Sequence, residues 1–164
     1  MGDEMTLLAA DENAPLRAAV ITLSDKGSRG ERKDESGPLI TQMLQDAGYK
    51  VEEEIIIPDE PEQLKSQLIR LADGRQLNLV LTTGGTGLSP RDNTPEATLA
   101  VADRNVPGIA EAMRYYSLSI TPRAMLSRAA SVLRGKTLIV NLPGSPKAVK
   151  ETLEYILPTL RHGV

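Results

Sequence analysis

Residues 79–98 read LVLTTGGTGLSPRDNTPEAT, an apolar run followed by a glycine-rich turn and a helix start. We expect the apolar run to be a buried strand that stops at Thr82-Thr83, after which three glycines follow within four positions. Glycine lacks a Cβ atom, so its backbone adopts positive φ angles and lets N–H groups approach a ligand closely. A row of such N–H groups forms a concavity that binds anions. This stretch therefore predicts a phosphate site at the carboxyl end of a strand.

The residues after the glycines predict a helix that begins at the same site. We expect Thr94 to be its N-cap and Pro95 to occupy its first turn. The positive end of the helix dipole adds to the attraction for phosphate. The loop also carries hydroxyl, guanidinium and carboxylate groups, at Thr83, Thr86, Ser89, Arg91 and Asp92. A loop that only reverses the chain does not need this polar set, so a ligand site is favoured over a plain turn.

The composition narrows the chemistry that is available. The 164 residues include no cysteine and a single histidine, His162. This excludes disulfides, thiol nucleophiles, zinc ribbons and iron–sulfur ligation, and it argues against a Ser-His-Asp triad. Carboxylates, Lys and Arg, hydroxyls, backbone amides and a hard cation such as Mg²⁺ remain. The length predicts one domain, residues 16–164, preceded by a loose tail at 1–15.

Charge and hydropathy exclude further classes of protein. The net charge of −3 is not the basic field of a general nucleic-acid binder, and four tyrosines without Phe or Trp offer no platform for stacking bases. No apolar run approaches the length of a membrane span. Residues 1–15 lack the basic start and the apolar stretch of a secretory signal. We therefore expect a cytoplasmic protein that binds neither nucleic acid nor membrane.

Strand and helix signals alternate along the chain. Strands are expected at 17–24, 51–57, 78–81 and 136–142, with a further strand at 129–133 that forms a hairpin with the last. Helices are expected at 36–48, 59–74, 94–103, 109–118 and 121–128, and a final helix is expected to kink or end early at Pro158. The alternation predicts an α/β fold of three layers, α/β/α, whose sheet is mostly parallel with one antiparallel edge strand.

In such sheets, ligands bind outside the carboxyl ends of the strands. Four loops are expected there, and each carries groups suited to phosphate or a cation: Ser24, Asp25, Asp34 and Ser36 in 24–36, Asp59 in 57–61, Asp92 in 83–94, and Asn141, Pro143, Gly144 and Ser145 in 141–146. Acids among phosphates repel them unless a metal bridges the two, which predicts Mg²⁺. Taken singly, Asp59 could cap the helix that follows it, and Asp92 could stabilise its own turn.

Two common nucleotide motifs are absent. The P-loop pattern Gly-x-x-x-x-Gly-Lys-Ser/Thr does not occur. The run from Gly84 to Gly87 does not match Gly-x-Gly-x-x-Gly, and it follows the third expected strand, not the first, so the dinucleotide fingerprint is missing too.

The motifs together resemble the molybdenum cofactor biosynthesis proteins, in particular the stand-alone MogA/MoaB group, which is related to the G domain of gephyrin. The resemblance is carried by the run from Thr83 to Gly87, by Asp92 and by TPEAT at 94–98. It extends to Ser24-Asp25 with Gly30, Asp34 and Ser36-Gly37, to Ile57-Pro58-Asp59, to Pro107-Gly108 with Ser127-Arg128, and to Asn141-Leu142-Pro143-Gly144. It covers about residues 17–160.

This resemblance implies a molybdopterin adenylyltransferase, which transfers AMP from ATP to the terminal phosphate of molybdopterin with Mg²⁺ and releases pyrophosphate. It implies that Asp59 and Asp92 are the catalytic aspartates and the metal ligands. Nucleotide and pterin contacts are implied at Ser24, Asp25, Thr83, Gly84, Gly85, Thr86, Gly87, Ser127, Pro143, Gly144 and Ser145. It also implies a homotrimer, with the downstream molybdenum-insertion protein as a candidate partner.

The residues support this chemistry independently, because an attacking phosphate oxygen needs alignment and charge neutralisation but no histidine base. In this hypothesis Asp92 positions Mg²⁺ on the triphosphate, and Asp59 orients the pterin phosphate or the metal. Three alternatives stay open: a non-catalytic carrier or scaffold of the same family, a metal-insertion domain of the kind found in longer chains, and a plain oligomeric scaffold with an empty loop. The presence of both aspartates favours the enzyme.

Overall fold

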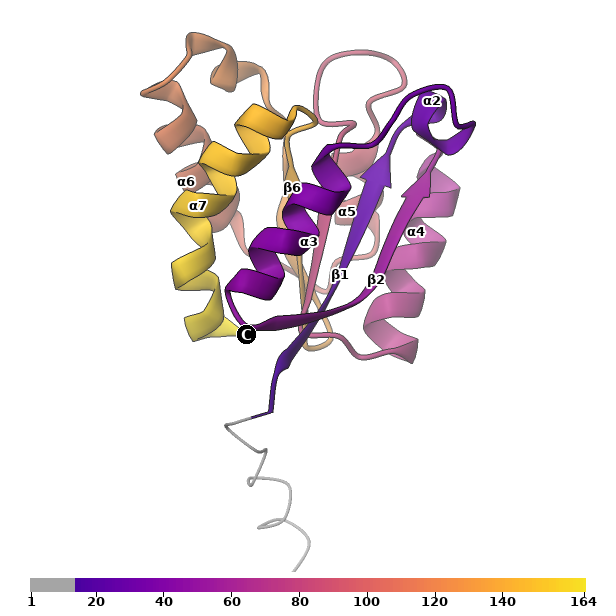
Figure 1. Ribbon diagram of the computed structural model, residues 1–164, viewed down its shortest axis with the longest axis vertical. Helices are drawn as coiled ribbons and strands as arrows, with labels where there is room; N and C mark the ends of the chain where they lie inside the picture. Colours follow the sequence, from indigo (N-terminus) through magenta and orange to yellow (C-terminus); the bar gives the residue numbers. More distant parts are fainter. Residues whose placement is uncertain (1–13) are drawn as a thin grey trace, which may run out of the picture.

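The computed structural model describes residues 14–164, so the expected tail at 1–15 lies almost entirely outside the described residues. At its centre is a six-stranded sheet in the order β2-β1-β3-β6-β5-β4 (Figure 1). The strands are β1 Leu16–Leu23, β2 Tyr49–Ile57, β3 Leu79–Thr83, β4 Arg104–Asn105, β5 Ser131–Arg134 and β6 Thr137–Leu142. Strands β2, β1, β3 and β6 run parallel, whereas β5 pairs antiparallel with both β6 and β4.

The predicted α/β class, the parallel sheet and the β5–β6 hairpin are confirmed. The antiparallel part of the sheet is larger than expected, because β4 adds a further edge strand beside β5. Its two residues, Arg104 and Asn105, are exposed and too few to show a periodicity. The helix expected at 94–103 ends at Ala100, which leaves room for this strand.

Helices cover both faces of the sheet. They are α2 Asp25–Ser28, α3 Ser36–Asp46, α4 Pro61–Ile69, α5 Thr94–Ala100, α6 Pro107–Leu118 and α7 Pro146–Gly163, with a π-helical turn η1 Arg70–Gly74 after α4 and a 3₁₀ turn η2 Pro122–Leu126 after α6. In Figure 1, α3, α6 and α7 lie in front of the sheet, and α4 and α5 lie behind it. The three-layer prediction is therefore confirmed.

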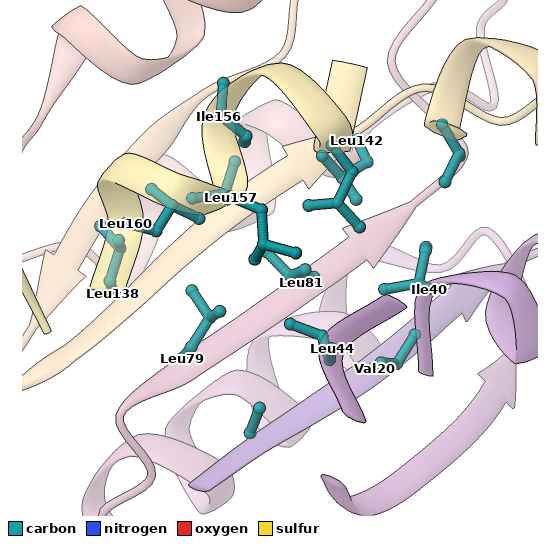
Figure 2. Close-up of a cluster of buried hydrophobic side chains, with 14 of the residues drawn as sticks. Val20, Ile40, Leu44, Leu79, Leu81, Leu138, Leu142, Ile156, Leu157 and Leu160 are labelled. Atoms are coloured by element: carbon teal, nitrogen blue, oxygen red, sulfur yellow. The ribbon is translucent and has the colours of Figure 1, made fainter. Parts of the chain in front are cut away.

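The strands alternate their side chains between two separate cores. In β3, Leu79 and Leu81 pack under α3, α6 and α7, whereas Val80 packs on the other face under α4 and α5. Figure 2 shows the first core, where Leu142 of β6 and Leu157 of α7 gather above the sheet. Because both faces are covered, the central strands are apolar without interruption, as parallel sheets require.

We expected Pro158 to kink or end the last helix early, but the helix does not end there, because α7 continues to Gly163. Proline removes one N–H, so the carbonyl four residues earlier, at Glu154, loses its helical partner. Both residues lie on the exposed side of α7, where water can satisfy that carbonyl. On the other side, Leu157 and Leu160 are buried in the core and hold the last turns in place.

None of the helices formed by residues 14–164 combines the length and the apolar character that crossing a membrane requires.

Candidate active site

The four predicted loops meet at the carboxyl ends of the parallel strands. The Thr83 hydroxyl at the end of β3 donates to the carbonyl of Pro143 after β6, at 2.6 Å. The Ser36 hydroxyl at the start of α3 donates to the carbonyl of Gly144, at 2.8 Å. These bonds join segments that lie 60 and 108 residues apart in the sequence. The loops therefore form one continuous rim.

Two glycines of the central loop are required by the backbone itself. Gly84 and Gly85 have φ angles of +95° and +71°, which side-chain-bearing residues rarely adopt. A Cβ atom on Gly84 would lie 2.6 Å from the carbonyl oxygen of Leu23, and one on Gly85 would lie 2.2 Å from Oγ1 of Thr94. The loop thus approaches β1 and α5 more closely than any other residue would permit.

This backbone presents three consecutive amides without a protein partner. Within residues 14–164, the N–H groups of Gly85, Thr86 and Gly87 donate no hydrogen bond. Thr86 is buried, and both glycines are half-buried. Unpaired amides of this kind are uncommon at such depth, and they favour an anion as the missing acceptor.

The direction of each free amide is set through the peptide that carries it, because a carbonyl and the following N–H share one rigid plane. The Thr94 hydroxyl donates to the carbonyl of Gly84 at 3.0 Å, and the Thr94 amide donates to that of Gly85 at 3.2 Å. The amide of Arg128 donates to the carbonyl of Thr86 at 3.0 Å. All three peptides are therefore held before any ligand binds.

Two aspartates interlock beside this loop. The amide of Asp59 donates to Oδ1 of Asp25 at 2.9 Å, and the amide of Asp25 donates to Oδ2 of Asp59 at 3.2 Å. The guanidinium of Arg91 forms a two-pronged pair with the Asp25 carboxylate, at 2.8 and 3.1 Å, and also reaches Glu60 at 3.0 Å. Asp59 does not cap α4, whose N-cap residue is Glu60. Arg91 therefore ties the glycine-rich loop to the loops after β1 and β2.

These surroundings shift the pKa values of the two aspartates in opposite directions. Burial raises the pKa of Asp59 above its ordinary value, and the nearby charges of Asp25 and Asp92 act in the same direction. The hydrogen bonds from Arg91 and from the Asp59 amide hold the pKa of Asp25 below its ordinary value. Asp59 is thus the carboxylate of this group whose ionised form a positively charged ligand would stabilise most.

Asp92 stabilises its own turn and faces the glycine-rich loop. Its Oδ2 accepts a hydrogen bond from the amide of Ser89 at 3.0 Å. This is the turn-stabilising role that the sequence allowed for Asp92 taken singly. A Cβ atom on Gly87 would lie 2.9 Å from the same oxygen, so this glycine lets the carboxylate approach the free amides. The other carboxylate oxygen accepts no hydrogen bond from the described residues.

Two cavities share the glycine-rich loop as a wall. The first, about 440 Å³, is lined by Ser24, Thr83, Gly84, Gly144 and Ser145, among others, with the cationic Arg32 and Lys33. The second, about 280 Å³, is lined by Thr86, Gly87, Ser127 and Pro143, with Arg114 and Arg123. The expected contact residues are therefore divided between two adjoining spaces. Asp25, Asp59, Gly85 and Asp92 line neither space.

The donor set fits Mg²⁺. Residues 14–164 contain no cluster of three or more His, Cys, Asp or Glu side chains able to enclose a metal. Magnesium typically takes one or two carboxylates and completes its shell with water and substrate phosphates. Asp59 and Asp92, each with one oxygen unpartnered by the described chain, match that requirement. The cation is therefore expected to arrive with the phosphates.

Several local predictions need correction. Asn93, not Thr94, is the N-cap of α5, because the Thr94 side chain turns back to the glycine-rich loop. Asn141 is fully buried within β6, where its amide donates to Thr82 and Thr98, so it belongs to the core. Ser24 caps the short helix α2, which lies inside the expected loop.

The sequence alone did not point to two arginines that hold the backbone around this site in place. Arg128 contacts Gly87 and Asp92, and Arg114 of α6 holds the segment around Arg128 through the carbonyl of Ala129, at 2.8 Å. The only signal of Arg128 was its place in the family motif. Arg114 gave no signal, because its partners are known only after folding.

Comparisons with known proteins identify relatives of this chain. The family model described as "Probable molybdopterin binding domain" matches residues 19–162. The molybdopterin adenylyltransferase of Escherichia coli (strain K12) is 46% identical over 144 residues, which are 86% of this chain and 73% of that protein. Gephyrin of Dictyostelium discoideum is 43% identical over 155 residues, which are 88% of this chain and 21% of gephyrin.

Solved structures show the same relationship. The molybdopterin biosynthesis enzyme MoaB from Thermus thermophilus has a TM-score of 0.85 and 50% identity, and the match covers 90% of this chain and 92% of that one. The family model and the relatives together confirm the resemblance drawn from the motifs. The chain belongs to the probable molybdopterin binding domain family of molybdenum cofactor biosynthesis proteins.

Proposed function

We propose that this chain is a molybdopterin adenylyltransferase, which moves AMP from ATP to the terminal phosphate of molybdopterin. An oxygen of the pterin phosphate attacks the α-phosphorus of ATP. The bond from that phosphorus to the oxygen bridging the β-phosphate breaks, and pyrophosphate leaves with the bonding electrons. The products are adenylyl-molybdopterin and pyrophosphate. The name of the 46%-identical relative from Escherichia coli supports this assignment.

The observation that carries the proposal is the row of three free amides at Gly85, Thr86 and Gly87. Charge spreads over the α-phosphate and the leaving pyrophosphate during the transfer. Fixed N–H donors that need no reorganisation stabilise such charge best. The tethers on the preceding carbonyls supply that rigidity.

The two cavities support a reaction between two bound substrates. Each substrate carries a bulky ring system and a phosphate, and the phosphates must meet for transfer to occur. Thr86 and Gly87, which carry free amides, line the second cavity, and Thr83 and Gly84 of the same loop line the first, so phosphates bound in the two spaces would meet at this loop. Such alignment accounts for a large part of the rate in phosphoryl and nucleotidyl transfer.

The aspartates complete the site. Bound Mg²⁺ would supply positive charge that offsets the triphosphate and the leaving pyrophosphate. Asp92 would hold that cation from beside the free amides, and Asp59 would hold it or orient the pterin phosphate from the opposite side. Arg91 keeps Asp25 ionised and so maintains the pair that fixes Asp59.

The test is incubation of the protein with ATP, Mg²⁺ and molybdopterin, followed by chromatography for adenylyl-molybdopterin and an assay for pyrophosphate. Both products are expected in equal amounts, and omission of Mg²⁺ should abolish them. A protein that binds both substrates without forming product would be the carrier alternative. That alternative draws support from one contact, since Asp92 already uses a carboxylate oxygen within its own turn.

The same proposal includes a homotrimer located in the cytoplasm. Large apolar side chains gather in exposed positions on α6, η2 and α7, namely Tyr115, Leu118, Met125, Leu126 and Tyr155, which is consistent with self-association through this face. Light scattering should give three chain masses. A charge introduced by Tyr115→Glu should reduce that mass.

A further inference from the structure

Arg128 joins the segment between η2 and β5 to the glycine-rich loop. Its amide donates to the carbonyl of Thr86, and its Nε donates to the carbonyl of Gly87 at 2.7 Å. Its Nη2 donates to the carbonyl of Asp92. One residue therefore holds the backbone on both sides of the exposed turn at 88–91.

The guanidinium is engaged by the protein on all three nitrogens. In addition to the two carbonyls, Nη1 pairs with the carboxylate of Glu96 in the first turn of α5. An arginine has five N–H donors in a rigid planar fork. Because each nitrogen of this fork already meets a protein oxygen, Arg128 is arranged to hold the loop and not to bind substrate.

These contacts act on the groups that the proposed chemistry uses. The main-chain amide of Arg128 holds the carbonyl of Thr86, which shares a peptide plane with the free amide of Gly87, and this bond does not depend on the side chain. The Arg128 side chain holds the next carbonyl along the loop, that of Gly87. The carbonyl of Asp92 is held directly, which limits where its carboxylate can lie. Arg128 is in turn anchored by Arg114 of α6, which donates to the carbonyl of Ala129.

We infer that Arg128 is a positioning residue of the active site, whose side chain sets the end of the glycine-rich loop and the Asp92 carboxylate by bracing the carbonyls of Gly87 and Asp92. This inference rests on the proposed adenylyl transfer for its kinetic consequence, but its structural consequence can be measured without any substrate. Arg128 touches no reacting atom in this role, so its removal should lower the rate more than the affinity.

The experiment compares Arg128→Ala and Arg128→Lys with Arg134→Ala. Arg134 is a matched control, because it also pairs with a carboxylate, Asp73, and with a carbonyl, that of Val101 at 2.9 Å, but at the opposite end of β5. Hydrogen–deuterium exchange of residues 84–94 in the ligand-free protein is the first readout. The kcat and the KM for ATP in pyrophosphate release are the second.

Arg128→Ala should raise exchange in 84–94 about tenfold and lower kcat roughly 100-fold, with a smaller change in KM. Millimolar guanidinium should restore part of kcat. Arg128→Lys keeps the positive charge but loses the planar guanidinium fork, so it should lose part of kcat. If the alanine variant does not fold, the lysine variant provides the test. Arg134→Ala should lower the Tm while leaving both the exchange of 84–94 and kcat unchanged.

Equal exchange of 84–94 in the Arg128 and Arg134 variants would overturn the inference, whether or not the protein is an enzyme. Normal kcat in the Arg128 variants of an active protein would overturn it as well. Absence of product with the unsubstituted protein would instead refute the proposed function, and the exchange measurement would still decide the role of Arg128.

Discussion

Glu53 of β2 accepts hydrogen bonds from Arg70 at 2.7 and 2.8 Å and from Arg75 at 2.9 Å, toward the amino ends of the strands. Asp59, just past the end of the same strand, accepts one backbone amide and no arginine. The pairing with Arg70 holds the pKa of Glu53 below its ordinary value, whereas burial raises the pKa of Asp59. The run of acids at 52–54, to which sequence analysis assigned no function, is largely neutralised by arginines.

This difference separates a region that stabilises the fold from one that is left ready for a ligand. Paired charges at partly exposed positions contribute modestly to stability. A buried carboxylate with few partners destabilises the free protein and is retained where binding repays the loss. A carboxylate thus serves stability at Glu53, whereas the role proposed for the carboxylate of Asp59 is binding.

The largest expected effect comes from replacing a glycine by alanine, which adds one methyl group, at each end of the sheet in turn. Gly85→Ala should abolish transfer and destabilise the fold by about 1–3 kcal/mol, because it combines positive φ with a clash at Thr94. Gly135→Ala, in the β5–β6 hairpin, also meets a positive φ of +56° but has no atom within 4 Å. It should cost about 1 kcal/mol and leave the activity intact. Equal loss of activity in both would contradict the comparison.

Asp92→Asn should keep the fold, since the amide oxygen can still accept the bond from Ser89. It should lower pyrophosphate release about 100-fold, because the neutral side chain no longer attracts the cation. Steady-state kinetics across a range of Mg²⁺ concentrations measures this effect. Turnover at the unsubstituted rate would remove Asp92 from the proposed role.

Replacing Asp59 and Glu53 by their neutral amides should change the free energy of unfolding in opposite directions. Asp59→Asn removes a charge that burial disfavours, so it should raise stability by up to about 1 kcal/mol while lowering activity. Glu53→Gln removes a charge that two arginines hold, so it should lower stability by a few tenths of a kcal/mol to about 1 kcal/mol and leave activity unchanged. Urea unfolding of both variants measures the sign, and a shared sign would refute the contrast.

The smallest expected effect is a pH dependence of the stabilisation that Glu53 provides through its pairing with arginines. The pKa of Glu53 is lower in the folded protein than in the unfolded chain, so its stabilisation is complete above its ordinary value and is lost as the pH falls through the folded value. The Tm of Glu53→Gln should therefore approach that of the unsubstituted protein as the pH falls below the ordinary value of 4.5. A difference that stays constant as the pH falls would show that Glu53 contributes by packing alone.

Much of the fold was predictable because the sheet follows short apolar runs. The alternation of Leu79, Val80 and Leu81 between the two cores is local information, and so is the glycine content of the loop that follows. The error at Pro158 arose because proline was judged by its effect on an isolated helix, whereas core packing on the opposite side of α7 carries that helix past it. Strand β4 was missed because two polar residues show no pattern.

The site was predictable only in part. Spacing indicated that Asp59 and Asp92 would lie at one rim and that Asp92 could stabilise its own turn, but not that Asp59 would interlock with Asp25. The roles proposed for these residues remain predictions. The link from Arg128 to the loop spans more than 30 residues of sequence, so no local pattern could show it.

By itself, the sequence determined the α/β class, the glycine-rich turn after β3 and the family, because each depends on neighbouring residues and their spacing. The tertiary structure decided which amides stay free, which carboxylates are paired and which arginines brace the loop. Those outcomes depend on hydrogen bonds between segments far apart in the chain, and such bonds exist only after the layers have packed in one register.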